Sequence, residues 1–244
     1  MGRADPELVG YNASMDTEEA SMNPDELKDF AMLPVEAFRG EASAYYDDAE
    51  SHLGDQWKLL IWPEIQHFNF AVTLDFAAGH GRNSVELAKL AGRMYVADAN
   101  PDAVQFLRQR FEGYDKTRCA VSVIQNNGVD LRDVPTGVVT ALYSFDSMVH
   151  FERRLVEAYM PEFQRIMAPG ALGFIHHSNF GRVSDDPDFR NHPAWRSNVD
   201  KNFFAQCCFR QGLLAVRQVT IDWPAEGVTV QDLDCISIIY KPKK

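Results

Sequence analysis

A carboxylate followed by two glycines stands where a short apolar segment ends, within residues 72–83. The residues at 72–76 favour a strand, and Asp75 lies inside that segment. Gly79 and Gly81 permit backbone angles and a close ligand approach that any Cβ would obstruct. Because the carboxylate of Asp75 would repel a pyrophosphate and attract a cation, this spacing predicts a ligand-binding turn for a group that carries an amino charge.

Two features separate this turn from a dinucleotide-binding turn. The dinucleotide fingerprint has a third glycine three residues after the second, whereas this chain has Ser84 there. A second acid, Asp98, ends the next strand-like segment, 93–97, and follows Gly81 by 17 positions, the usual place for a carboxylate that accepts ribose hydroxyls. A ligand with an ammonium group, a ribose and no phosphate fits both acids, and S-adenosylmethionine is such a ligand. A nicotinamide dehydrogenase is the weaker alternative.

At these residues the chain resembles the class I S-adenosylmethionine-dependent methyltransferases that act on small molecules, and the resemblance runs from about Tyr45 to the C-terminus. Asp75, Gly79 and Gly81 match the first motif of that family, and Asp98 matches the second. The resemblance therefore implies S-adenosylmethionine as the cofactor. After the third expected strand, 121–125, the family usually has an acid that meets the adenine amino group. The residues placed at the cofactor on this basis are Asp75, Ala77, Gly79, Gly81, Asn83, Asp98, Ala99, Asn127, Gly128, Ser144 and Tyr46, with the amide oxygen of Asn127 replacing the acid.

Strand and helix patterns alternate along the chain without an internal repeat, which favours an α/β, doubly wound sheet. Further strands are expected at 138–145, 172–176, 213–222 and 233–240, and helices at 83–91, 153–167 and 198–211. The resemblance implies a Rossmann-like, seven-stranded sheet with an antiparallel closing strand, and a turn at Pro169-Gly170. We divide the chain into a mobile tail at 1–24, an N-terminal helical lid at 25–67 with helices at 36–48 and 55–67, and a methyltransferase domain at 68–244.

The composition of the chain limits which binding partners and which cellular location we expect. The formal charge of the 244-residue chain is −11, and its basic residues cluster only at Lys241, Lys243 and Lys244, so nucleic acid is disfavoured as a partner. No apolar run is long enough to span a bilayer, and the four cysteines lack metal-ligand spacing, which favours free thiols in the cytoplasm. We expect a small-molecule acceptor as partner, no membrane, and consider a homodimer.

Histidines near the ends of the expected strands are the candidate bases. His150 lies in the loop after the fourth strand, which the family places beside the methyl group, and His176 and His177 end the fifth strand. Alternation along that strand directs at most one of these two toward the site. An alcohol acceptor must lose its proton as it attacks, whereas an amine need only be neutral, so a base favours an oxygen acceptor. We therefore predict methyl transfer to a hydroxyl of a small molecule.

The acceptor is expected to contact the long loop at 180–197, where Trp195 and polar neighbours are typical of a sugar or glycoside site. Two alternatives stay open, namely an N-methyltransferase for an amino sugar or another amine, and a module that binds the cofactor without catalysis. A divalent metal held by Asp146, His150 and the acids at 185–188 is disfavoured, because an acidic loop is usually solvated. We predict no metal site.

Overall fold

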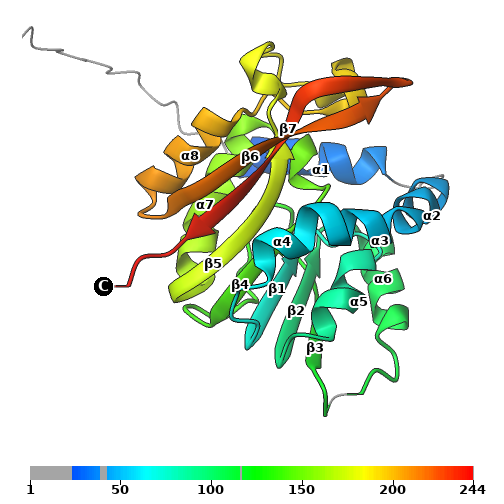
Figure 1. Ribbon diagram of the computed structural model, residues 1–244, viewed down its shortest axis with the longest axis vertical. Helices are drawn as coiled ribbons and strands as arrows, with labels where there is room; N and C mark the ends of the chain where they lie inside the picture. The colour runs from blue at the N-terminus through cyan, green and yellow to red at the C-terminus, as the bar shows by residue number, and fades with distance from the viewer. Residues whose placement is uncertain (1–23, 39–42, 116, 244) are drawn as a thin grey trace, which may run out of the picture.

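The computed structural model describes residues 24–38, 43–115 and 117–243, and within these ranges the side chains of 24, 25, 43–45 and 47 lie outside the description. A single seven-stranded sheet runs through the molecule, with the strand order β3-β2-β1-β4-β5-β7-β6 (Figure 1). The strands are β1 (Val72–Phe76), β2 (Arg93–Asp98), β3 (Ala120–Gln125), β4 (Val139–Ser144), β5 (Met167–Ser178), β6 (Leu214–Ala225) and β7 (Val228–Tyr240).

Parallel pairing brings the carboxyl ends of the central strands together. β1 pairs in parallel with β2 and with β4, and β4 pairs in parallel with β5. β7 alone runs antiparallel, between β5 and β6. The expected Rossmann-like sheet with an antiparallel closing strand is therefore confirmed, and the order reverses between β1 and β4, where doubly wound sheets bind their ligands.

Helices cover both faces of the sheet. One core contains buried side chains of α1 (Pro24–Ala37), α7 (Arg153–Ile166) and α8 (Lys201–Arg210). The other contains those of α4 (Trp62–Ile65), α5 (Arg82–Ala88) and α6 (Pro101–Arg110). Alternation along β1 explains the division, since Leu74 and Phe76 face the first core and Asp75 bonds to α5 on the opposite face. Burial on two faces is the source of the sheet's stability.

The N-terminal helices differ from the prediction. One helix was expected over 36–48, but α1 ends at Ala37, and the next described helix is α2 (Ser43–Ser51). The second expected helix, 55–67, is found as α3 (Leu53–Gln56), a π-helical turn (Trp57–Ile61) and α4. The expected tail at 1–24 lies outside the described residues except for Pro24, which begins α1.

The turn expected at Pro169-Gly170 is instead part of β5. This strand begins at Met167, directly after α7, and its register against β4 shifts between the pairs Val139–Met167 and Ala141–Leu172. Gly170 has φ = +85° in this irregular stretch, so the pair forms a bulge in the strand and not a loop before it. The other expected strands and helices are present, with ends that differ by a few residues.

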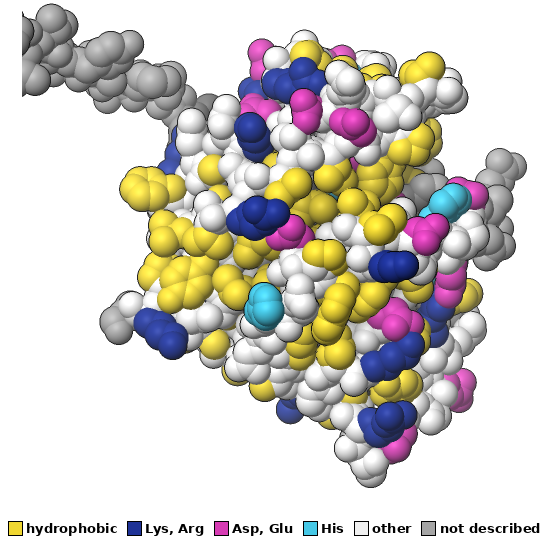
Figure 2. Space-filling model, in the orientation of Figure 1, with side chains coloured by type: hydrophobic (Ala, Val, Ile, Leu, Met, Phe, Trp, Pro, Cys, Tyr) yellow, Lys and Arg dark blue, Asp and Glu magenta, His cyan; other side chains and the backbone are white. Residues whose placement is uncertain are grey.

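The surface carries both signs of charge. On the face shown in Figure 2, Lys and Arg side chains are interspersed with Asp and Glu and do not form a continuous basic patch. Within 24–38, 43–115 and 117–243, no helix has both the length and the apolar character needed to cross a membrane. All four cysteines are free and buried, which confirms the expected thiols.

Candidate active site

The turn after β1 has the backbone that the glycines predicted. Ala77, Gly79 and Gly81 all have positive φ, at 54°, 55° and 78°. A Cβ on Gly79 would lie 2.9 Å from Cε1 of Tyr46, and one on Gly81 would lie 2.5 Å from Cδ2 of Leu107. Both glycines are therefore required by conformation and by close packing, and Gly81 caps the start of α5.

Asp98 links this turn to the end of β2. Its Oδ2 accepts a hydrogen bond from the Gly79 N–H at 2.7 Å, and its Oδ1 accepts one from the Asn100 N–H at 2.8 Å. Burial raises the pKa of Asp98, while these backbone bonds act in the opposite direction. Each carboxylate oxygen keeps further acceptor capacity, which suits a pair of ligand hydroxyls.

Asp75 is buried on the opposite face of β1, with 2% of its surface exposed. The Ser84 hydroxyl donates to its Oδ2 at 2.6 Å. Burial raises the pKa of Asp75 to about 7, the hydrogen bond from Ser84 lowers it, and the neighbouring Asp98 raises it further. A carboxyl in this state becomes an anion when a cation arrives beside it.

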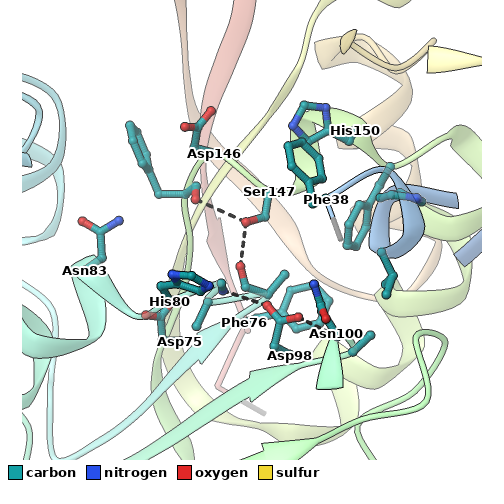
Figure 3. Close-up of a pocket in the computed structure, with 18 of the residues that line it drawn as sticks. Phe38, Asp75, Phe76, His80, Asn83, Asp98, Asn100, Asp146, Ser147 and His150 are labelled. Atoms are coloured by element: carbon teal, nitrogen blue, oxygen red, sulfur yellow. Dashed lines mark hydrogen bonds between the residues drawn. The ribbon is translucent and has the colours of Figure 1, made fainter. Parts of the chain in front are cut away.

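A cavity of about 1020 Å³ of empty space, partly open to solvent, lies over these carboxylates (Figure 3). The sequence-predicted residues that line it are Asp75, Ala77, Gly79, Asn83, Asp98, Ala99, Gly128, Tyr46 and His150. Gly81, Asn127, Ser144, His176 and His177 are not among its lining residues. Of these, Ser144 is fully buried at the end of β4, and the next residue, Phe145, lines the cavity.

Asn126 takes the place in the cavity that the sequence suggested for Asn127. The side-chain oxygen Oδ1 of Asn127 accepts from the backbone N–H groups of Val129 and Asp130, so that side chain holds its own turn. The Asn126 amide nitrogen donates to Asp130 O and to the Tyr159 hydroxyl, whereas its buried Oδ1 has no partner among the described residues. A buried acceptor without a donor on a cavity wall suits a ligand N–H.

His150 stands at the other end of the cavity, beside Phe38 (Figure 3). Its Nδ1 bonds to the backbone oxygen of Trp195 at 2.6 Å, and because a carbonyl only accepts, Nδ1 carries the proton. Nε2 therefore presents a lone pair, and it is buried without a hydrogen-bond partner in the described part of the chain. Burial and the charge of Arg196 lower the pKa of His150 to about 4, so the imidazole is neutral at pH 7.

His176 and His177 have partners at both ring nitrogens. His176 Nδ1 accepts from the Asp146 N–H at 3.1 Å, and Nε2 bonds to Asp234 Oδ2 at 3.1 Å. His177 bonds to Ser178 O at 2.7 Å and to the Ser237 hydroxyl at 2.8 Å, and burial lowers its pKa to about 4. Both are fully buried, so neither presents a lone pair to the cavity.

Several cavity residues carry no signal in the sequence pattern. The apolar side chains of α1 form one wall, and Arg82 and Asp146 form another, joined by an ion pair at 2.9 Å. Tyr46 of α2 stacks on His80, with ring centroids 3.6 Å apart, and His80 stacks on Phe106 at 4.1 Å. These contacts hold α2 against the glycine turn. The wall residues are Ala31, Pro34 and Val35 of α1 and Phe38, which directly follows it.

The loop expected to meet the acceptor is packed into the molecule. His192, Arg196 and Ser197 are buried, and the Trp195 ring, 39% exposed, packs against Phe38 and Phe189. The cavity-lining residues do not include Trp195. Among the described residues no group of three or more His, Cys, Asp and Glu is arranged to hold a metal ion.

Comparison with known proteins agrees with this geometry. A family model described as a methyltransferase domain matches residues 73–170. No curated protein sequence matches the chain significantly. Among solved structures, an S-adenosylmethionine-dependent methyltransferase from Methanosarcina mazei has a TM-score of 0.58 at 13% identity, covering 75% of this chain and 98% of its own.

Two further structures share the fold. An S-adenosylmethionine-dependent methyltransferase from Aquifex aeolicus has a TM-score of 0.54 at 14% identity, covering 79% of this chain and 98% of its own. The [4+2]-cyclase SpnF has a TM-score of 0.60 at 12% identity, covering 78% of this chain and 82% of its own. Residues 73–170 thus match a methyltransferase domain, these structures share the fold of the chain, and the enzyme is a methyltransferase whose cofactor is S-adenosylmethionine.

Proposed function

We propose that this enzyme methylates a hydroxyl group of a small, uncharged molecule, with His150 as the general base. The observation that carries the proposal is the unpartnered Nε2 of His150 at the acceptor end of the cavity. The bond from Nδ1 to Trp195 O selects the tautomer in which Nε2 can receive a proton. An amine acceptor would have no need of such a group.

The cavity residues fit the cofactor. Asp98 would hold the ribose hydroxyls, Asp75 the cationic amino end, and Asn126 Oδ1 the adenine amino group. The unpartnered oxygen of Asn126 supports this assignment. When bound, S-adenosylmethionine supplies an electrophilic methyl group on a cationic sulfur.

The charges at the acceptor end favour a neutral substrate. Asp146 is paired with Arg82 at 2.9 Å and lies 3.8 Å from Arg196. An ammonium group beside Asp146 would therefore meet a carboxylate whose charge is already compensated. The proposal of a sugar or glycoside rests on Trp195, and because that ring packs against Phe38, we widen the substrate class to neutral alcohols and phenols.

The chain's own contribution is position and exclusion of water. Orienting two reactants is worth roughly 7–11 kcal/mol, more than the 10²–10⁴-fold in rate that one base adds. Phe38 packs on the His150 ring with centroids 5.1 Å apart, and α1 lines the cofactor end through Ala31. We therefore assign α1 and α2 as a lid, which keeps water from the reacting groups.

The proposal is tested by incubating the full chain with methyl-labelled S-adenosylmethionine and a panel of alcohols, phenols, glycosides and matched amines. Labelled ethers should form with at least one hydroxyl compound, and the analogue in which an amine replaces that hydroxyl should react much more slowly. Labelled amines without labelled ethers would overturn the proposal. Binding of the cofactor without transfer to any compound would favour the non-catalytic alternative.

Cofactor affinity should depend on pH through Asp75. Its pKa is raised to about 7, so below pH 7 a cationic ligand must first displace a proton, and affinity should weaken by up to about tenfold per pH unit. Above about pH 8 the affinity should be constant. Calorimetric titration with S-adenosylmethionine at pH 6 and pH 8, in two buffers of different ionisation heat, measures the proton release. The Asp75→Asn variant should show neither effect, and equal affinity of the unmodified enzyme at both pH values would contradict the prediction.

Asn126 and Asn127 form a matched pair for the adenine contact. We expect the enzyme to bind S-adenosylhomocysteine more tightly than its inosine analogue, which lacks the 6-amino group, by about 1–2 kcal/mol. Asn126→Ala should remove this preference because it removes the unpartnered acceptor. Asn127→Ala should keep the preference, since that side chain bonds within its own turn. Competitive binding of the two ligands to each variant decides between them.

A further inference from the structure

The backbone segment whose carbonyl accepts the hydrogen bond from His150 has an unusual conformation. Ala194 and Trp195 have φ values of +46° and +55°, in a region that side chains other than glycine avoid. Such a conformation persists only where its surroundings enforce it. The Trp195 N–H donates to His192 O at 3.0 Å, while Trp195 O accepts the bond from His150 Nδ1 at 2.6 Å.

Arg196 holds this strained segment from within the molecule. Its Nη1 donates to Ala194 O at 2.9 Å, while Nε and Nη2 donate to the two carboxylate oxygens of Asp234 at 2.8 and 2.7 Å. Arg196 is 3% exposed and Asp234 is fully buried. The guanidinium makes these bonds from three separate nitrogens, whereas a lysine has all its donors on one nitrogen and could not span the Ala194 carbonyl and both Asp234 oxygens.

The same arginine belongs to a closed ring of four residues. Arg196 Nη2 lies 3.8 Å from Asp146 Oδ1 on the cavity wall, and the Asp146 N–H donates to His176 Nδ1. The bond between His176 Nε2 and Asp234 Oδ2 closes the ring. Although burial raises the pKa of Asp234, Arg196 and His176 lower it to about 2, so the carboxylate stays ionised at any working pH.

We propose that Arg196 is a positioning residue for His150, which fixes the Ala194–Trp195 backbone so that the Trp195 carbonyl orients the imidazole with Nε2 toward the acceptor. Asp234 and His176 in turn fix Arg196. The inference rests on the proposed role of His150, but its structural part can be tested without an acceptor. It also assigns a role to His176 and Asp234, two buried residues that take no part in the cofactor site.

The charged groups around His150 are few among the described residues. After burial, the charge of Arg196 has the largest effect on the pKa of His150 and lowers it, whereas the charges of Asp146 and Asp234 raise it. The ring of Phe38, just after α1, and the ring of Phe189 in the loop pack on the imidazole. Removing the arginine charge should therefore move the pKa of His150 up, toward the ordinary value of about 6.5.

Nitrogen-15 NMR of the histidine side chains in the full chain tests the inference. The resonances of His150 are assigned by their loss in His150→Gln. In the unmodified protein we expect a single tautomer with the proton on Nδ1. Arg196→Lys keeps the charge but not the fork of donors, so the Nδ1 proton should exchange faster and the second tautomer should appear. Arg196→Met should in addition raise the pKa of His150.

Arg190→Met is the matched control, because Arg190 is exposed, lies in the same loop, pairs with the half-buried Asp188 at 2.7 Å, and should leave the His150 signals unchanged. If Arg196→Met fails to fold because the buried Asp234 loses its cationic partner Arg196, the Arg196→Met/Asp234→Leu double variant removes both charges. Folded variants at Arg196 with the tautomer, exchange rate and pKa of the unmodified protein would overturn the inference. Full methyl transfer by a His150→Ala variant would instead overturn the proposed function and leave the NMR result standing.

Discussion

We expect His150→Ala to lower kcat by about 10²–10⁴-fold and to change the affinity for S-adenosylmethionine by no more than a few-fold. A general base acts in the transition state and contributes little to ground-state binding, so the loss falls on kcat. The ring lies at the acceptor end of the cavity, away from Asp98, which also separates it from cofactor binding. The measurement is steady-state methyl transfer to the acceptor that the panel identifies, with calorimetry for the cofactor.

The pH profile gives an independent check. Because the pKa of His150 is lowered to about 4, the imidazole is protonated and inactive only below that pH. The rate should rise with pH through about 4 and be flat near the ordinary imidazole pKa of about 6.5, where the sequence alone would place the limb. His67→Ala, at an exposed histidine outside the cavity, is the control. Retention of most activity by His150→Ala would show that the reaction needs no base there and would favour an amine acceptor.

The second large effect is expected at Asp98. Asp98→Ala removes the acceptor of two ribose hydroxyls, each hydrogen bond to a charged group being worth roughly 1.5–3 kcal/mol, so cofactor affinity should fall by about tenfold or more. The backbone N–H groups of Gly79 and Asn100 also lose their acceptor, so the thermal unfolding of the variant must be recorded beside its affinity. Asp102→Ala removes the same charge from the exposed start of α6 and should bind normally. An unchanged dissociation constant in folded Asp98→Ala would remove Asp98 from the site.

The glycine turn and the two acids could be predicted because their signal is local. A strand, a carboxylate and glycines with positive φ follow one another within a few residues, and parallel pairing of β1 with β2 brings Asp98 to Gly79. Backbone sterics and sheet geometry alone give this arrangement. The same holds for the order of strands and helices, although their ends depend on packing.

The rest of the site depends on contacts that spacing does not encode. Asn126 and Asn127 are equivalent in the sequence, and only the turn bonds from Val129 and Asp130 to Asn127 decide which amide is left for a ligand. The pairing of Arg196 with Asp234 spans 38 positions, and it explains why His176 is enclosed. The end of α1 at Ala37 was missed because Phe38 and the pair Tyr45-Tyr46 extend the aromatic pattern beyond it.

The side chain of Arg82 forms hydrogen bonds to two different parts of the cavity wall. Its Nη1 donates to Ala49 O and to Gln56 Oε1, which belong to the lid and the helix after it, and its Nη2 donates to Asp146 Oδ2 on the acceptor wall. If α1 and α2 act as the proposed lid, lifting α2 from the glycine turn would break the bond from Arg82 to Ala49 O and would change the guanidinium that holds Asp146. Release of a methylated product would then be coupled to a rearrangement of the acceptor wall.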